Sequence, residues 1–406
     1  MKTPIVMHAL PRWDGPYAST SCQMAKVLSQ DRLVFYVDNP FTLKDRLKQN
    51  AQIKRRLKIW KGEAPPFLTP FPEFKNFIAI SPPVIFPINA LPSGLIYNAM
   101  RTFYEKAIWR VIDETLEHYQ VEQFHYVNSF LPQFSHIHST KQVVRKFYHC
   151  VDLIEGENYI ARHGVKAEAD FACVADATIS TSRALQERMS RYNKHSCFVP
   201  NAADFSLFSK TTSTAIPEDL ESIKGVKIIY SGNIGLRLDY AMIYEAATLE
   251  PTWNFVFIGP IDQAKFSGEK LYTLSNVHFL GSKPYEALPT YLSHADVCLI
   301  PFEKSELTKY IYPLKINEYL ATGKPVVSTS FANLSDFESV IYQANSATEL
   351  IKAVSNALSE NSNEKIEARK KVAESNTWEE RAKAFDAILD MPKAHFSKAV
   401  LNSTTL

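Results

Sequence analysis

Two charged residues three positions apart are the clearest sign of chemistry in this sequence. The stretch from Tyr312 to Thr329 reads YPLKINEYLATGKPVVST, and Lys315 and Glu318 share one face if it begins as a helix. Pro313 suits a first helical turn, whose free N–H groups bind anions, and Lys315 adds a charge for a phosphate. Glu318 can accept hydrogen bonds from the two hydroxyls of a ribose. The stretch predicts a site for the diphosphate and ribose of a sugar nucleotide, although a solvated Lys–Glu pair on a surface helix would have the same spacing.

Two loops in the same half of the chain could complete such a site. In YSGNIGLRLDY (230–240) a strand ends in a glycine-containing turn, and Arg237 follows where a helix begins. Glycines there allow a phosphate to approach the backbone, and Arg237 can bind two phosphate oxygens. The loop 281–285 also follows a strand, so Tyr285 either meets a nucleobase or packs at a helix start. A tight surface turn remains the alternative for the first loop.

The elements that must position these residues alternate between short apolar runs and helical patterns. This rhythm is typical of a parallel α/β sheet, and a second set of such runs begins near Lys224. The segment 199–220, rich in Ser, Thr and Pro, is the expected linker. We therefore expect an α/β protein with two doubly wound, Rossmann-like domains, 1–205 and 206–375, that face a cleft, followed by an amphipathic helix at 376–392.

The N-terminal half offers candidates for contact with an acceptor. The loop PRWDGPYAST follows the first predicted strand and would face the donor across the cleft. Gly15 could bring backbone N–H groups to the diphosphate, and Trp13 or Asp14 could touch the acceptor, unless Asp-Gly-Pro is an ordinary turn. His125 and Asp152 are expected at or just past strand ends, where either could act as a general base or orient the acceptor. A histidine in an aromatic strand is more often a core residue.

Composition excludes several other classes. The 406 residues include 46% hydrophobic and 22% charged residues with a net charge of +2, which fits a globular protein and not a generic nucleic-acid binder. The five cysteines are scattered without a CxxC pair, so neither a zinc site nor a disulfide framework is favoured. No signal peptide and no membrane-spanning run is expected. We expect a cytoplasmic protein without a metal or other cofactor, since no DxD-type pair ends a strand in the second half.

A basic segment indicates a further partner. Residues 43–61 hold eight basic residues and one Asp, and a stretch rich in Phe, Ile and Pro follows. This pattern suits an anionic membrane surface, so we expect contact through residues 43–95 on the inner face of the cell membrane. A solvated basic helix beside an internal apolar loop is the alternative. Nucleic-acid binding explains the segment less well, because no reader motif accompanies it.

The second half of the chain resembles a known family. The motifs GNIGLR, VHFLG, LPTYLSHADVCLIPF and PLKINEYLATGKPVVST, with VPNAADFSLF and TWEERA at either end, resemble the donor domain of GT-B glycosyltransferases, specifically the large retaining family four, over residues 199–390. The resemblance implies a sugar nucleotide held between two Rossmann-like domains and a final helix that crosses back to the first. It places Asn233 and Arg237 near the donor phosphates and Glu318 at the ribose, and Leu314 joins the donor-binding set.

The chain departs from the family at one position. Members often carry a second glutamate eight residues before the ribose-binding one, where it meets the transferred sugar, but here this residue is Tyr310. Tyr310 is therefore included in the donor-binding set. The departure leaves open which sugar is transferred and whether its stereochemistry is retained.

These observations predict a glycosyltransferase that moves a hexose from a nucleoside-diphosphate sugar, expected to be a UDP sugar, onto a surface glycan or lipid-linked acceptor. Lys315, Arg237 and helix N–H groups would stabilise the leaving diphosphate without a metal. If the enzyme inverts, Asp152 is the candidate base. A dinucleotide-dependent oxidoreductase is disfavoured because no GxGxxG follows the first strand. A non-catalytic relative that binds a sugar nucleotide or glycan as a partner subunit remains the alternative, and turnover would distinguish it.

Overall fold

The chain forms two compact units, which are described separately. The computed structural model describes all residues except 1, 16–18, 49–50, 158–159, 211–214 and 393–406. The first unit comprises residues 1–200 and 381–406, and the second comprises residues 201–380.

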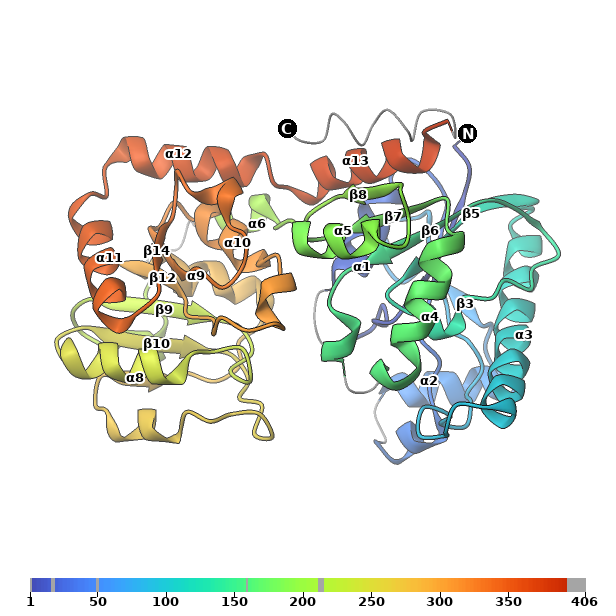
Figure 1. Ribbon diagram of the computed structural model, residues 1–406, viewed down its shortest axis with the longest axis horizontal. Helices are drawn as coiled ribbons and strands as arrows, with labels where there is room; N and C mark the ends of the chain where they lie inside the picture. The colour runs from blue at the N-terminus through green and yellow to red at the C-terminus, as the bar shows by residue number, and fades with distance from the viewer. Residues whose placement is uncertain (1, 16–18, 49–50, 158–159, 211–214, 393–406) are drawn as a thin grey trace. The chain divides into compact units, whose positions relative to one another are not determined.

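The first unit is built on an eight-stranded sheet covered by helices (Figure 1). The strands are β1 Ile5–Ala9, β2 Val34–Val37, β3 Phe67–Leu68, β4 Phe77–Ile80, β5 Gln123–Ser129, β6 Gln142–Cys150, β7 Ala177–Ser180 and β8 Ser196–Phe198. Their order is β3-β4-β2-β1-β5-β6-β7-β8, and every neighbouring pair is parallel except β3 with β4. The helices are α1 Thr20–Leu28, α2 Ala51–Trp60, α3 Leu95–His118, α4 Ala161–Val174 and α5 Arg183–Ser190, with 3-10 turns η1 Leu43–Lys48, η2 Pro132–Phe134 and η3 Ile154–Gly156.

Helices cover both faces of this sheet, and strand alternation shows how. Successive side chains of a strand point to opposite faces. On β6, Tyr148 packs against Phe171 of α4, with ring centroids 6.1 Å apart. The next residue, His149, meets Phe385 of α13 (Trp378–Asp390) at 5.2 Å. Apolar runs such as those of β1 and β2 are therefore buried along their whole length.

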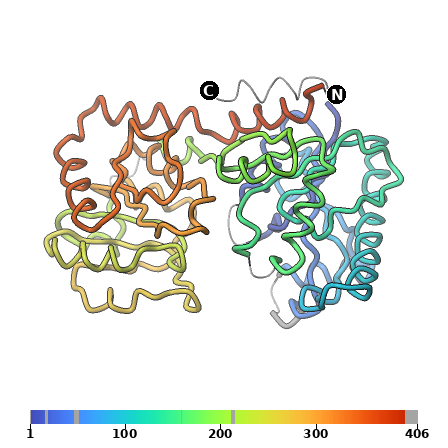
Figure 2. Tube along the Cα trace, in the orientation of Figure 1, coloured from blue at the N-terminus to red at the C-terminus, as the bar shows by residue number. Residues whose placement is uncertain are grey.

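The end of α13 is bonded to the first unit. Arg32 is buried and its Nη2 lies 2.6 Å from carboxylate oxygens of both Asp386 and Asp390. Lys2 also pairs with Asp386 at 2.5 Å. Figure 2 shows the blue start of the chain beside the red helix. Paired charges at a buried arginine explain why a polar helix face is held against the sheet.

The second unit has a six-stranded, fully parallel sheet. Its strands are β9 Lys227–Ser231, β10 Asn254–Ile258, β11 Val277–Phe279, β12 Val297–Ile300, β13 Val326–Thr329 and β14 Tyr342–Ala344. Their order, β11-β10-β9-β12-β13-β14, is the doubly wound Rossmann order, which reverses between β9 and β12. Ligands bind such sheets at the carboxyl ends of the strands beside this reversal.

Helices again surround the sheet. They are α6 Phe205–Ser209, α7 Glu218–Glu221, α8 Tyr240–Leu249, α9 Leu288–Ser293, α10 Leu314–Ala321, α11 Ala347–Ser359 and α12 Asn363–Glu374, with 3-10 turns η4 Glu269–Thr273, η5 Tyr285–Ala287, η6 Thr308–Tyr310 and η7 Ser335–Phe337. Helix α11 packs on α8 and on β12 to β14, whereas α10 packs on α6 and α12. The predicted fold class, two doubly wound α/β domains, is confirmed. Within the described ranges, no helix is both long enough and apolar enough to cross a membrane.

Candidate nucleotide-sugar site

Closely packed glycine loops form the carboxyl edge of the second sheet. Gly232 follows β9 with φ 143°, and Gly259 follows β10 with φ 150°. The Gly232 N–H donates to Ile258 O at 2.8 Å, and the Gly259 N–H donates to Gly281 O at 2.9 Å. A Cβ atom on Gly259 would lie 1.9 Å from the carbonyl oxygen of Gly232. Only glycine fits these positions, and the edge therefore exposes backbone in place of side chains.

Lys315 lies directly over this backbone. A Cβ atom on Gly232 would lie 2.2 Å from Lys315 Cε and 2.7 Å from its Nζ. The same ammonium lies 5.9 Å from the ring centroid of Tyr230. Desolvation lowers the pKa of Lys315, the charge of Glu318 raises it, and that of Arg237 lowers it further. Two cations near a single carboxylate leave an excess of positive charge that suits an anion such as a diphosphate.

Glu318 lies one turn along α10 and is bound by Tyr285. The Tyr285 hydroxyl donates to Glu318 Oε1 at 3.1 Å. Desolvation raises the pKa of Glu318, while Lys315 and this hydrogen bond lower it. Burial and the Glu318 charge raise the pKa of Tyr285, so its phenol stays neutral and acts as the donor. Within the described part of the chain, Tyr285 is thus the hydrogen-bond partner of Glu318 at Oε1.

The start of α10 is held against β9. The sequence had placed Pro313 in the first helical turn. In the structure Pro313 is the N-cap residue, and the helix begins at Leu314. The Ile316 N–H donates back to Pro313 O at 3.2 Å. One turn later the Tyr319 hydroxyl accepts from the backbone N–H of Ser231 at 2.8 Å. This last bond fixes the spacing between the helix and the strand end on which Gly232 lies.

Tyr230 and Tyr319 are two positioning residues that the sequence analysis missed. The Tyr230 hydroxyl donates to Asn233 O at 2.9 Å and so holds the loop after β9. Both tyrosines are buried, and a buried phenol needs a hydrogen-bond partner. That rule was the available signal, but the sequence does not say where the partners lie.

The remaining donor-side candidates take their places around this group. Asn233 is exposed in the loop after β9, and Arg237 is half-buried with its carbonyl accepting from Glu303 N at 2.8 Å. Leu314 is the half-buried first residue of α10. Tyr310 ends η6, with Lys309 Nζ 5.8 Å from its ring centroid. Lys315, Glu318, Tyr285 and the Arg237 charge thus come together, whereas no direct contact joins Tyr310 to them among the described residues.

The loop after β1 in the first unit differs from what was expected of it. The Gly15 N–H donates to Arg12 O at 3.1 Å, so this amide is engaged inside the loop, and the proposed contact of the loop with a diphosphate stays a prediction. The Trp13 N–H donates to Asp38 Oδ1 at 3.0 Å. Asp14 is engaged by Arg56, whose Nη2 lies 3.1 Å from Asp14 Oδ1. The turn is therefore built by internal bonds, and its polar groups largely serve the fold.

His125 is not at the carboxyl end of a strand, and that expectation is wrong. It is the third residue of β5 and pairs with Ile5 at the start of β1. Its Nε2 lies 3.6 Å from Asp390 of α13, and desolvation lowers its pKa to about 4. It is a core histidine beneath α13. Asp152, by contrast, does follow the carboxyl end of β6, and its Oδ1 accepts from Leu153 N at 2.8 Å.

The basic segment is also only partly a solvated surface. Arg56 of α2 is 2% exposed, and its Nη2 donates to Asp38 Oδ2 at 2.5 Å. Burial raises the pKa of Asp38 to about 7 although Arg56 opposes the shift. Ile53 on the same helix is buried too. Arg56 therefore serves the loops that follow β1 and β2, and the expected membrane contact through residues 43–95 stays a prediction for the exposed cations.

Comparison with known proteins agrees with this geometry. Residues 227–360 match the family described as glycosyl transferases group 1. A relative from Bacillus subtilis (strain 168), TuaH, named for teichuronic acid biosynthesis as a glycosyltransferase, is 28% identical over 268 residues. That match spans 61% of this chain and 66% of the relative, a little under two thirds of its length.

Solved structures show the same fold over nearly the whole chain. Sucrose-phosphate synthase from Thermosynechococcus elongatus has a TM-score of 0.65 at 14% identity, covering 95% of this chain and 98% of its own. The UDP-forming trehalose-phosphate synthase from Burkholderia vietnamiensis has 0.66 at 11%, covering 96% and 98%. Anabaena Alr3699/HepE, solved with UDP and glucose, has 0.63 at 11%, covering 96% and 100%. The fold is the GT-B fold. Within it, residues 227–360 match the group 1 glycosyl transferase family.

Proposed function

We propose that this protein is a glycosyltransferase that moves a hexose from a UDP sugar onto a surface-polysaccharide or lipid-linked glycan acceptor. The observation that carries the donor half is the group formed by Lys315, Glu318 and Tyr285 above the glycine edge of the second sheet. HepE, which shares the fold, was solved with UDP and glucose. TuaH is named for the biosynthesis of a glycan polymer, teichuronic acid. The site of action would be the cytoplasmic face of the membrane.

Binding follows from the chemistry of these side chains. The diphosphate would lie beside the loop at Gly232, against the Lys315 ammonium that packs on this glycine. Glu318 would accept from the ribose hydroxyls, and Tyr285 would hold that carboxylate in place through its hydroxyl. A substrate whose hydroxyls are matched by a buried acceptor is selected strongly over one that lacks them.

Catalysis would rest on charge that develops on the leaving diphosphate. Lys315 and Arg237 supply positive charge in a desolvated setting, where each acts more strongly than in water. This chemistry requires no metal. In a retaining reaction the donor phosphate takes the proton of the acceptor hydroxyl, whereas in an inverting reaction Asp152, after β6, is the proposed base.

The test is nucleotide release from a panel of UDP-, GDP-, dTDP- and ADP-sugars, read beside thermal shift with the free nucleotides. Slow release from UDP sugars alone, abolished by Lys315→Ala, is the expected result. Release from another donor would refute the UDP assignment. The absence of both stabilisation and release would refute the site.

A second candidate function is a partner subunit that binds the sugar nucleotide without turning it over. Tyr310 favours it, because this position in related enzymes often carries the glutamate that meets the transferred sugar. Stabilisation by a nucleotide with no release from any donor, even with cell-surface glycan acceptors added, would support the binding subunit over the transferase.

A further inference from the structure

Helix α3 begins with apolar side chains that no described residue of its own unit covers. Leu95 is 88% exposed, Ile96 is 72% exposed and Phe103, two turns on, is 69% exposed. Phe86 is also 61% exposed, and its backbone N–H donates to the hydroxyl of Tyr104 of the same helix at 3.3 Å. We call Leu95, Ile96 and Phe103, which share one face of α3 by their helical spacing, the apolar tip. Large apolar side chains grouped in this way mark an interaction surface.

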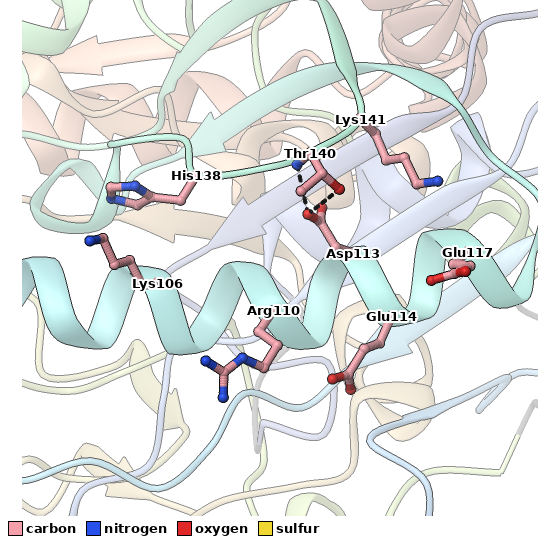
Figure 3. Close-up of a pocket in the computed structure, with 8 residues that line it drawn as sticks. All are labelled: Lys106, Arg110, Asp113, Glu114, Glu117, His138, Thr140 and Lys141. Carbon is pink, nitrogen blue, oxygen red and sulfur yellow. Dashed lines mark hydrogen bonds between the residues drawn. The ribbon is translucent and has the colours of Figure 1, made fainter.

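The exposed side of α3 changes character along its length. Lys106 and Arg110 follow the apolar tip, and the acidic residues Asp113, Glu114 and Glu117 come after them (Figure 3). These side chains line a shallow polar pocket of about 340 Å³ beside the loop that carries Thr140. At about 1.5 Å per residue, the cations lie roughly 5–10 Å beyond Phe103 along the axis, and the acids lie roughly 15–21 Å beyond it.

This order selects one kind of partner. An anionic bilayer presents hydrocarbon, then phosphates, then water, and α3 presents apolar, then cationic, then acidic side chains. The apolar tip would enter the acyl boundary while Lys106 and Arg110 meet phosphates, and the acids would stay at a distance where repulsion is screened. We propose that the apolar tip and these two cations of α3 dock the protein on an anionic membrane, a surface distinct from the basic helix α2.

The apolar tip is joined to the edge of the sheet where an acceptor would be used. Tyr97 stacks on His163 of α4, with ring centroids 3.7 Å apart, and His163 Nε2 donates to Leu91 O at 3.0 Å. Arg162 donates to Ala90 O at 2.7 Å. Helix α4 follows β6 and Asp152, at the carboxyl edge of the first sheet. Docking would bring this edge to the bilayer. Its purpose, access to a lipid-linked acceptor, rests on the proposed function.

The experiment is co-sedimentation of the full chain with vesicles of phosphatidylcholine mixed with phosphatidylglycerol, and with vesicles of phosphatidylcholine alone. Binding to the anionic vesicles that weakens with salt is expected. Leu95→Ser/Ile96→Ser/Phe103→Ser should weaken the partition by about a hundredfold or more, since three exposed apolar side chains lose their burial in lipid. Lys106→Glu/Arg110→Glu should abolish the preference for anionic vesicles.

Matched controls distinguish binding through this surface from non-specific hydrophobic binding to vesicles. Val174→Ser/Leu249→Ser removes exposed apolar side chains elsewhere and should leave binding unchanged. Wild-type protein that ignores both vesicles, or a triple serine variant that binds as well as wild type, would overturn the proposal. The proposal would also be overturned if the wild-type protein were a dimer that does not bind vesicles and the triple serine variant were a monomer. The apolar tip would then be covered by a second copy of the chain. UDP affinity, measured in parallel, tests the donor site independently of this surface.

Discussion

Replacing Glu318 by alanine should weaken UDP binding while leaving the protein folded. The substitution removes a carboxylate whose Oε1 accepts from Tyr285 at 3.1 Å and whose charge raises the pKa of Lys315. Desolvation already raises the pKa of Glu318, so the fold does not depend on that charge. Its proposed purpose is the ribose.

The size of the effect follows from the lost hydrogen bonds. Hydrogen bonds to a charged group contribute about 1.5–3 kcal/mol, which corresponds to an affinity loss of about 10- to 150-fold. Glu318→Gln keeps an acceptor for Tyr285 and for one hydroxyl but lacks the charge, and should fall between wild type and Glu318→Ala. The free energy of unfolding should change by less than about 2 kcal/mol, because both Glu318 and Lys315 are only half-buried.

Isothermal titration with UDP measures the affinity, and urea unfolding measures the stability. Glu374→Ala, an exposed glutamate in the last turn of α12, is the matched control and should bind UDP normally. If Glu318→Ala binds UDP within about twofold of wild type, the ribose assignment is wrong. An equal loss in the control would show that the effect is general electrostatics and not the site.

Three further perturbations test the surrounding structure. Gly232→Ala places a Cβ 2.2 Å from Lys315 Cε at φ 143°, so UDP affinity should fall at least about tenfold in titration, and unchanged affinity would refute the contact. Arg56→Met removes the guanidinium that pairs with the buried Asp38 and with Asp14, so urea unfolding should show a loss of about 3–5 kcal/mol, and a loss below about 1 kcal/mol would contradict the burial. Burial lowers the pKa of His8 and of His149 to about 3, so these neutral histidines stabilise the fold above the unfolded pKa near 6.5 and the stability is lost as pH falls toward 3. Between about pH 7.5 and about pH 5.5, each of the two histidines should lower the free energy of unfolding measured with urea by about 1.4 kcal/mol. A free energy that does not change with pH would show that both histidines are solvated.

The grouping of Lys315, Glu318, Gly232 and Arg237 was predictable because these residues are local in sequence. Lys315 and Glu318 lie one helical turn apart, and Gly232 and Arg237 end one strand and precede one helix, so spacing alone indicates their chemistry. The partner of Glu318 was harder to predict from the sequence. Tyr285 had been assigned to a nucleobase or to packing, and its bond to a side chain 33 positions away appears only in the folded chain.

The first half was harder to interpret for a related reason. Asp14 and Arg56 look like an acceptor ligand and a membrane cation, yet they are partners of each other. His125 looks like a catalytic residue at a strand end, yet β5 begins two residues before it. Charge and residue type are visible in a sequence, but whether a charge is solvated or paired depends on residues far along the chain.

The sequence by itself determined the fold class, the two-part organisation and the donor motifs, because periodicity and short-range spacing encode strands, helices and their ends. The tertiary structure alone decided which charged side chains are paired and which apolar side chains remain exposed to solvent. Those outcomes depend on long-range packing: Arg56 is buried against Asp14 and Asp38, and Leu95, Ile96 and Phe103 are left exposed because no described element of their unit covers the start of α3.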